Sequence, residues 1–558
     1  MRLFIGVGTM VATAICAGTG DLRAGESRDA LMEAHRGGSM RFVSKAAFGS
    51  ADPHINYHSL FWMMSQSVYD GLVAYKKAEG AESTTVVPDL AEDMPVISND
   101  GKTYTFKIRK GVHFSNGKEL TVEDVQASLR RIFKVASPTA GSFYNGIVGA
   151  EDCLAAPGDC TLEGGVSVDP GAGTVTINLT RPDAEFLYKL SVPHAYIVPA
   201  DTPASDTGTV PTPGTGAYMI ESYDPNKSVI LKRNPAFVEW SVDAQPDGFV
   251  DELRIDFGLT EEAQVNAIIN GQADMMTDSP PSDRLVEIGT NFADQVHINP
   301  QAAFWYVPLN MNIPPFDNLK ARQAFAHAVN LNVPVDFFGG PRLASPTCQV
   351  LPQGFPGYRP FCLHTKNPGE AWTGPDMEKA RALVEASGTQ GQKVAVVVDD
   401  SDAGRNIGLY LQSVLTDLGY DASVNSISGN IHFTYIQNTN NKVQASVSQW
   451  YADYPAAANF LNVLIGCGSF HPGSDSSINI SGMCDEKIQA RMDQAMALGS
   501  TDPEAANDLW SEIDREVMEQ VPMVPLFNPS NVDFASKRMG NYMFSPQYHI
   551  VYANAWVQ

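Results

Sequence analysis

One acidic residue, Asp453, stands among aromatic side chains in the stretch SQWYADYPAAANFLN, residues 448–462. Four aromatic residues flank it: Trp450, Tyr451, Tyr454 and Phe460. A carboxylate among aromatic rings loses hydration, which is unfavourable unless a cation or hydrogen-bond donors meet it. The residue types leave three roles open for Asp453: a catalytic group, a loop acid that caps a helix beginning near Ala456, or a binding site for a cationic ligand.

No other pattern in the sequence favours catalysis. GVHFSNGKE, residues 111–119, has one residue too many between its glycines for a phosphate-binding loop, and it ends in Glu119 where Ser or Thr would bind magnesium, so it predicts a hairpin turn. The GxSxG and HExxH motifs do not occur. His54 and His58 are four residues apart but lack a nearby third metal ligand. We expect no cofactor, no metal site and no enzymatic activity.

Six cysteines follow Cys16, and they fall into three close pairs along the chain. Short loops close most easily, which favours the pairs Cys153–Cys160, Cys348–Cys362 and Cys467–Cys484 among the 15 possible connectivities. Each disulfide would add about 2–3 kcal/mol in the chain-entropy model. Free buried thiols are the alternative. An even number of cysteines suits an oxidising compartment outside the cytoplasm.

The elements around these residues predict an α/β protein. Tyr104, Phe106 and Ile108 alternate with polar residues, as in a half-buried strand, and Thr121 precedes a helical pattern. Residues 377–428 alternate between helical and strand patterns, which indicates βαβ units and a parallel or mixed sheet. A chain of 558 residues predicts two or three domains.

The N-terminus and the overall charge indicate where the protein works. Arg2 precedes an apolar run, residues 3–17, with small residues after it, which predicts a signal peptide of residues 1–24 and a periplasmic protein. Bulky Ile15 before Cys16 argues against a lipid anchor. The formal net charge of −25 argues against binding to nucleic acid or to an anionic membrane surface.

Four stretches in sequence order resemble the peptide/nickel class, family 5, of extracytoplasmic solute-binding proteins of ABC importers. They are residues 90–132 (LAEDMPVISNDGKTYTFKIRKGVHFSNGKELTVEDVQASLRRI), 214–237 (GTGAYMIESYDPNKSVILKRNPAF), 307–330 (VPLNMNIPPFDNLKARQAFAHAVN) and 446–462 (SVSQWYADYPAAANFLN). The similarity runs through nearly the whole chain after the signal.

The resemblance implies a two-lobed, periplasmic-binding-protein type II-like fold with an extra subdomain in the first lobe. Lobe I would comprise residues 38–66, 191–298 and 521–558, with the additional subdomain at 67–190, and lobe II would comprise residues 299–520. The two lobes would close by a hinge around a solute.

The resemblance also implies a ligand. In peptide-binding members, an acid in a similar W-x-x-D-Y context binds the α-ammonium of the ligand, and here that acid is Asp453. Aromatic neighbours would exclude water and add cation–π attraction. Three successive aromatics cannot all face one core in a strand, so we expect at least one of Phe304, Trp305 and Tyr306, namely Trp305, to face the cleft or an exposed edge. The further ligand candidates are Trp450, Tyr451, Tyr454, Tyr435, Asn438 and Phe48, with His54 as another wall residue.

The predicted function is capture of a short peptide or other amine-bearing solute and its delivery to a membrane-embedded ABC permease by a monomer. A sugar or opine conjugate, a metal chelate or haem are alternative ligands, because relatives handle all of these and Tyr454-Pro455-Ala456 replaces the Pro-Asp-Pro that often follows the motif. A secreted glycan or peptide hydrolase and a chemosensory or chaperone role are the other function classes.

Overall fold

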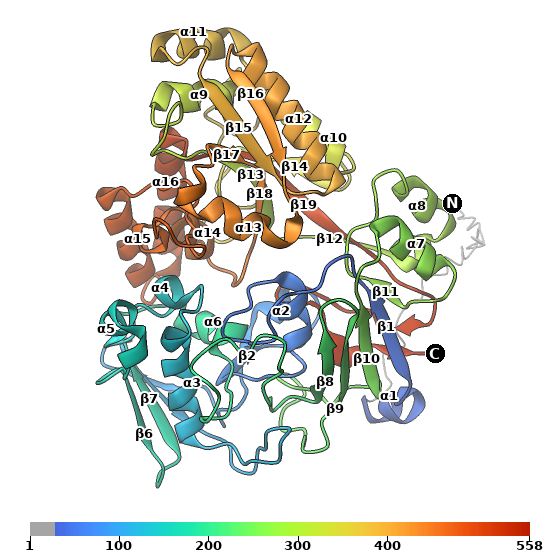
Figure 1. Cartoon of the computed structure of the whole chain (residues 1–558). Coiled ribbons are helices and arrows are strands. Elements are labelled where there is room, and N and C mark those ends of the chain that lie inside the picture. Colours follow the sequence, from blue (N-terminus) through green and yellow to red (C-terminus); the bar gives the residue numbers. More distant parts are fainter. Residues whose placement is uncertain (1–27) are drawn as a thin grey trace, which may run out of the picture.

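The structure, a computed structural model, describes residues 28–558 and forms two lobes. In Figure 1 the lower lobe holds the elements from α1 to α8 and the last strands, and the upper lobe holds those from β13 to α16. The last strands are β20 (Met539–Gly540), β21 (Phe544–Ser545), β22 (His549–Ile550) and β23 (Trp556–Val557). The predicted signal peptide, residues 1–24 with Cys16, lies outside the described residues. Within residues 28–558, none of the helices combines the length and the apolar character that crossing a membrane requires.

A five-stranded sheet forms the right-hand part of the lower lobe (Figure 1). Its order is β11 (Met275–Met276), β1 (Ser39–Val43), β10 (Glu252–Asp256), β9 (Ser228–Arg233) and β8 (Tyr218–Asp224). β1 runs parallel to both β10 and β11, whereas β8 and β9 form an antiparallel hairpin. α1 (Arg28–His35), α7 (Glu261–Ile269) and α8 (Leu285–Asn291) lie beside this sheet. The lobe therefore combines segments that are distant in sequence.

The rest of the lower lobe has a separate four-stranded antiparallel sheet, which we call the subdomain sheet. Its order is β4 (Val96–Ser98), β5 (Thr103–Lys107), β7 (Thr174–Asn178) and β6 (Val166–Asp169). α3 (Val122–Lys134) packs against it and begins at a capping box, in which Thr121 and Asp124 each bond the backbone of the other. The short helices α4 (Ala140–Phe143), α5 (Ala150–Ala155) and α6 (Phe186–Leu190) and the pair β2 (Val73–Tyr75) and β3 (Val86–Pro88) complete this region.

One fully buried ion pair ties α3 to the loop after β1. The guanidinium of Arg131 donates to Asp52 at 2.8 Å and contacts His54 at 3.1 Å. His54 has no exposed surface, and its Nε2 bonds the carbonyl oxygen of Tyr196 at 2.8 Å. The expectation that His54 forms part of the cleft wall is therefore wrong, because both ring nitrogens of His54 contact buried groups of the lower lobe. α2 (Ser59–Ser65) follows, with His58 accepting from the Leu60 amide as its N-cap.

The upper lobe contains the predicted βαβ region. β15 (Lys393–Val398) runs parallel to β16 (Asp421–Ser426) on one side and to β17 (Ala445–Ser446) on the other. α12 (Asp402–Asp417) connects β15 to β16, as a parallel crossover requires. The remaining helices of this lobe are α9 (Leu319–Ala328), α10 (Asn332–Phe338), α11 (Met377–Ser387), α13 (Gly429–Gln437), α14 (Ala458–Ile465), α15 (Glu486–Leu498) and α16 (Pro503–Gln520).

The two lobes share one long strand, β19 (Met523–Phe534). Its second half pairs with β12 (Val296–Pro300), and its first half pairs with β13 (Ala303–Pro308) and β14 (Ala344–Pro346). Figure 1 shows β12 and β19 passing from one lobe to the other. Two neighbouring strands joined by ladder hydrogen bonds therefore connect the lobes, and such a connection can bend as a hinge.

Disulfides join Cys153 to Cys160, Cys348 to Cys362 and Cys467 to Cys484, so every cysteine of the described chain is paired. These are the pairs that short loop closure favours, and the alternative of free thiols does not hold. Each bond closes a local loop of one lobe and none connects the two lobes, so the disulfides leave a hinge motion free.

Replacing Cys348 and Cys362 by Ala should lower the free energy of unfolding by about 3 kcal/mol, because the denatured chain regains the entropy of a loop whose ends are 14 residues apart. Urea denaturation of the variant and the wild type measures the difference. The same change at Cys153 and Cys160, which are 7 residues apart, should have a slightly smaller effect of about 2.5 kcal/mol. Free thiols in an unreduced digest of the wild type would contradict the pairing.

Candidate ligand-binding site

Asp453 lies at the boundary between the lobes. It follows β18 (Ser448–Tyr451), which is the edge strand beside β13, and it precedes α14. The N-cap of α14 is Ala457, and no side chain caps that helix. The alternative role of Asp453 as a helix cap is therefore wrong. Its side chain instead contacts residues of both lobes.

Two donors meet the same carboxylate oxygen of Asp453. The Tyr57 hydroxyl, from the lower lobe, donates to Oδ2 at 2.8 Å, and so does the side-chain amide of Asn459, from the first turn of α14. The Asp453 backbone amide in turn donates to Asn459 Oδ1 at 2.9 Å. Asn459 therefore fixes Asp453 from one side, and Tyr57 reaches it across the boundary between the lobes.

The carboxyl group of Asp453 lacks a cationic partner. No Lys, Arg or His in residues 28–558 forms an ion pair with it. Burial raises the pKa of Asp453 to about 7, although the hydrogen bonds from Asn459 and Tyr57 oppose this increase. A half-buried carboxylate with two neutral donors and no counter-ion gains most from a bound cation, because its charge is only partly compensated.

Aromatic side chains surround this group. Trp450 is 5% exposed, and its indole N–H points at Asn459 Oδ1, 3.4 Å away. The Tyr57 ring meets the Trp450 ring edge-on, with the centroids 6.1 Å apart. Tyr451, by contrast, is 41% exposed, and burial of its hydroxyl end raises its pKa. Trp450 thus packs against Tyr57 and Asn459, which hold the carboxylate, whereas Tyr451 lies on the opposite face of β18, on the same side as Trp305.

The chain matches known proteins over most of its length. Residues 85–471 match the family model of the bacterial extracellular solute-binding proteins, family 5, middle region. The chain belongs to this family. The periplasmic oligopeptide-binding protein OppA of Escherichia coli K12 is 24% identical over 504 residues, covering 84% of this chain and 86% of OppA. The probable deoxycholate-binding periplasmic protein YgiS of the same strain is 23% identical over 525 residues, covering 91% of this chain and 92% of YgiS.

The fold of this family 5 protein is also that of its solved relatives. The structure of clavulanic acid biosynthesis oligopeptide binding protein 2 superposes with a TM-score of 0.80 at 22% identity, covering 94% of this chain and 96% of that chain. The predicted two-lobed, type II-like fold is therefore confirmed. This similarity shows the fold, whereas the candidate site residues follow from the contacts within the present structure.

The expectation that Trp305 faces the cleft is wrong. Phe304, Trp305 and Tyr306 are 0%, 7% and 1% exposed. Phe304 and Tyr306 stack on each other at 4.6 Å on one side of β13, and Trp305 stacks on Phe527 at 5.4 Å on the other. The strand lies between two apolar layers, so all three aromatics are buried although their side chains alternate.

Phe48 does not line the cleft either. It is 4% exposed and stacks on Tyr223 at 4.4 Å within the core of the lower lobe. Tyr435 and Asn438 belong to the end of α13 and the turn after it. Tyr435 packs in a small apolar cluster of the upper lobe, and the Asn438 side chain bonds Asp475 at 2.7 Å and the Asn440 amide at 3.0 Å. Internal contacts therefore occupy all three side chains.

Tyr454 is buried, with 1% of its surface exposed, and it packs against the lower lobe instead of facing a ligand space. Its ring meets the edge of Phe143 with the centroids 5.2 Å apart. Of the candidates near Asp453 in sequence, the structure thus places Trp450 against Tyr57 and Asn459, Tyr454 between the lobes, and Tyr451 on the other face of β18 with an exposed side chain.

Sequence reasoning missed Tyr57 and Asn459. Tyr57 lies 396 positions before its partner Asp453, so nothing in the sequence connects the two. In the stretch around Tyr57, we considered only His54 and His58, as possible metal ligands. Asn459 had a weak signal, because it is a polar residue in the otherwise apolar stretch AAANFL. It is fully buried, and buried amides normally have a hydrogen-bonding purpose.

Asp453→Asn should stabilise the ligand-free protein at pH 8 but not at pH 4. The raised pKa means that the folded protein holds this proton up to about pH 7, while the unfolded chain loses it near pH 4, so the wild type loses stability as the pH rises from about 4 to about 7. Asparagine can keep both hydrogen bonds at one oxygen without a charge. We expect a gain of about 2 kcal/mol at pH 8, measured by urea denaturation at both pH values. An equal effect at the two pH values would contradict the assignment.

Proposed function

We propose that this protein binds a short peptide or another amine-bearing solute between its lobes, outside the inner membrane, and delivers it unchanged to an ABC import permease. The observation that carries the proposal is Asp453, a half-buried carboxylate between the lobes that has two neutral donors and no cation among the described residues. Membership of family 5 and the likeness to an oligopeptide-binding protein support it.

An α-ammonium group fits the site chemically. It is a compact donor of three hydrogen bonds, and an ion pair with Asp453 would be a charge-assisted bond of the strong kind. The Tyr57 ring, whose hydroxyl donates to the carboxylate, adds an apolar wall and a face for cation–π attraction. A bound ammonium would lower the pKa of Asp453, so the carboxyl group would lose its proton when the ligand binds near or below pH 7.

The hinge explains how a ligand enters and leaves. Tyr57 belongs to the lower lobe and Asp453 to the upper lobe, so opening at β12 and β19 separates the two. A ligand held by Asp453 is then accessible, and closure surrounds it. The same motion lets a permease that favours the open form release the ligand, since a partner shifts such an equilibrium only through different affinities for the two states.

The proposed location is the periplasm, after removal of the signal peptide in residues 1–24. Three disulfides in the described chain support an oxidising compartment. No catalytic step belongs to the proposal, because the geometry at Asp453 provides recognition and its neighbours Tyr57, Asn459 and Trp450 position one another rather than a nucleophile. The protein works as a monomer in this proposal.

A random tripeptide pool tests the function directly. We expect the stripped protein to retain intact tripeptides in native mass spectrometry and to ignore the same pool with acetylated amino termini, because acetylation removes the ammonium charge. Asp453→Asn should weaken binding of a retained peptide by about 2 kcal/mol or more, roughly 30-fold, in calorimetry. Equal retention of both pools would contradict ammonium recognition, and peptides that emerge cleaved would indicate a hydrolase.

The same calorimetry tests whether Asp453 releases a proton when the ligand binds. At pH 6, binding of a retained tripeptide should release close to one proton per ligand, seen as a dependence of the heat on the ionisation enthalpy of the buffer, since Asp453 is protonated before binding and ionised afterwards. At pH 8.5 the release should disappear. Asp453→Asn should show no release at either pH, and a wild type without release at pH 6 would contradict the raised pKa.

A further inference from the structure

Tyr454, the residue directly after Asp453, belongs to the upper lobe but is buried against the lower one. Its ring meets the Phe143 ring at 79° with the centroids 5.2 Å apart, and the Lys189 ammonium lies 5.8 Å from its centre. Phe143 ends α4 and Lys189 lies in α6, so both come from the region of the subdomain sheet. Figure 1 shows α4 and α6 directly below α14 and α15 of the upper lobe.

The receiving surface, which we call the socket, consists of Phe143, Glu185 and Lys189. The Lys189 ammonium pairs with Asp183 at 2.7 Å and lies 3.8 Å from Glu185 Oε2, and the side chains of Lys189 and Glu185 are only 4% and 9% exposed. The socket is thus formed by one short segment, residues 183–189, together with the end of α4.

Outside residues 183–189, Glu185 interacts with residues of the upper lobe. Its carboxylate interacts with the Tyr454 hydroxyl and with the backbone of Ala458, at the start of α14. Burial raises the pKa of Glu185 to about 7, and Lys189 opposes this increase. Without the upper lobe, the Tyr454 ring and the socket would both be open to water. The contact therefore exists only when the lobes are closed.

We propose that Tyr454 is the latch of the closed form: its side chain enters the socket of Phe143, Glu185 and Lys189, and its position next to Asp453 couples capture of an ammonium group to closure of the lobes. The coupling rests on the proposed function, whereas the latch contact itself does not. In this proposal the region of the subdomain sheet provides the surface that the upper lobe contacts when the lobes close.

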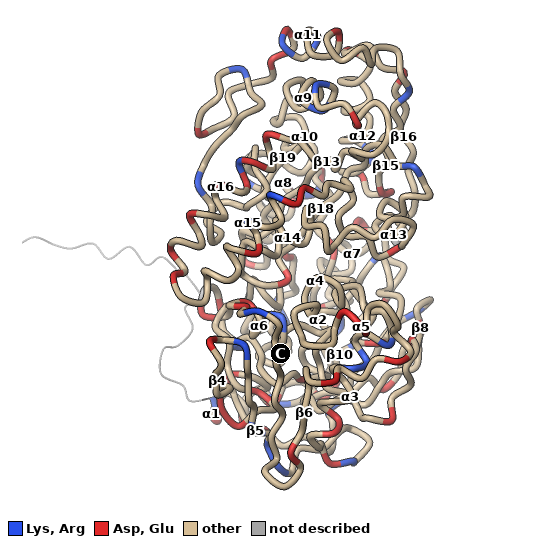
Figure 2. The backbone as a smooth tube through the Cα atoms, turned by 90° about the vertical axis from the view of Figure 1, so that its left-hand side faces the viewer, with Lys and Arg blue, Asp and Glu red and all other residues tan. Residues whose placement is uncertain are grey.

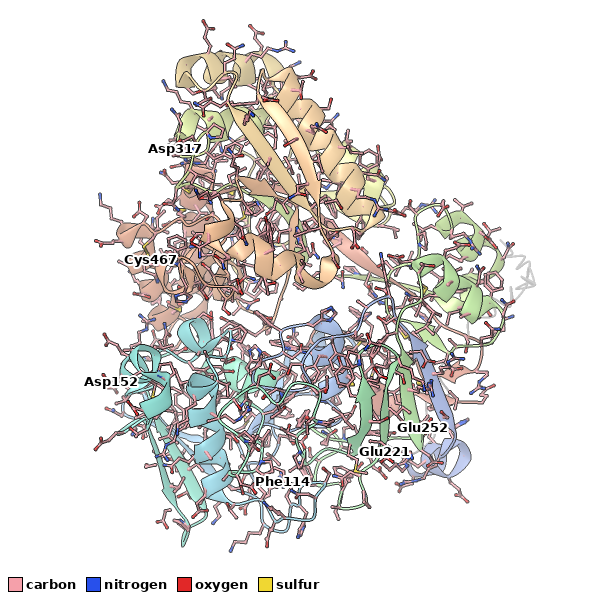
Figure 3. All side chains as sticks on the ribbon, viewed as in Figure 1. Phe114, Asp152, Glu221, Glu252, Asp317 and Cys467 are labelled. Atoms are coloured by element: carbon pink, nitrogen blue, oxygen red, sulfur yellow. A yellow bond between two sulfur atoms is a disulfide. The ribbon has the colours of Figure 1, made fainter. Side chains whose placement is uncertain are left out.

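An exposed ion pair also joins the lobes on this side of the molecule. Arg181 and Asp493 form an ion pair at 2.9 Å between the lobes, but their side chains are 42% and 37% exposed, and exposed ion pairs contribute little. Figure 3 shows the same side, with Cys467 in the upper lobe above Asp152 in the lower lobe. Tyr454 adds a fully buried aromatic side chain to one apolar cluster that joins residues of both lobes, so its loss weakens the closed form.

Small-angle X-ray scattering of the full chain tests the latch through the ratio of closed to open molecules, with and without an equimolar mixture of trialanine, trileucine and trilysine. We expect Tyr454→Ala and, from the opposite lobe, Phe143→Ala to lower this ratio at least about tenfold in both conditions, because each removes a buried aromatic side chain from the contact. Tyr454→Phe keeps the ring and should lower the ratio less, by about two- to fivefold.

Tyr420→Phe is the matched control. The Tyr420 hydroxyl is also buried and bonds Thr389 at 2.7 Å, but within the upper lobe, so its loss should leave the ratio of closed to open molecules unchanged. Thermal unfolding of each variant checks that it is folded. If Tyr454→Ala does not fold, Tyr454→Phe and Phe143→Ala carry the test.

The latch is overturned if the Tyr454 and Phe143 variants close as fully as the wild type, or if the wild type has no closed molecules in either condition. The peptide mixture should raise the closed fraction of the wild type, and Asp453→Asn should abolish that rise. If the variants lower the closed fraction of the peptide-free protein but the mixture never raises it in the wild type, the latch stands and its coupling to peptide capture is overturned.

Discussion

The structure depends on a carboxylate whose charge the protein itself only partly compensates. Asp453 is half-buried between the lobes, and a hydroxyl from one lobe and an amide from the other share a single oxygen of it. Neutral donors reduce the penalty of burial but do not remove it, as the pKa of about 7 shows. In the proposed function a cation from outside completes the arrangement, and the carboxylate whose burial is costly in the ligand-free protein provides affinity for an amine.

The lobes are organised around this position. The strand β19 runs continuously through both of them, so they stay connected while the surfaces on either side separate. Asp453 and Tyr454 are neighbours in sequence but face different partners: Asp453 meets Tyr57, and Tyr454 meets Phe143. The proposed recognition residue and the proposed latch are thus adjacent on a single turn, and Asn459 of the following helix holds this turn by a hydrogen bond.

Charge acts at longer range. The formal net charge is −25, and Figure 2 shows acidic residues over both lobes. Such a protein attracts cationic and zwitterionic solutes with a positive end at low ionic strength, and this attraction is screened over about 8–10 Å in physiological salt. In the proposed function this long-range attraction assists the encounter with the ligand, whereas selection of the ligand depends on the short-range contacts at Asp453.

Helix caps, the βαβ pattern and the short disulfide loops were predicted correctly, because interactions between residues close in sequence determine them. Thr121 caps its helix, the βαβ pattern gives the parallel strands β15 and β16, and the cysteines pair within short loops. The W-x-x-D-Y resemblance singled out Asp453, whose contact with a ligand stays a prediction. Predictions of which side chains face the cleft failed, because the direction of a side chain depends on the residues packed around it in space. Trp305 and Phe48 have the composition of cleft walls but pack in cores, since a strand between two apolar layers has no exposed side.

The sequence by itself indicated the elements, the cysteine pairing, the family and the acidic residue at the centre of the proposed site. Only the tertiary structure decided which side chains meet that residue, because Tyr57 reaches Asp453 from 396 positions away and the socket for Tyr454 comes from α4 and α6. The physical reason is that periodicity and caps are set by neighbours along the chain, whereas burial, pKa and contact across the lobes are set by neighbours in space.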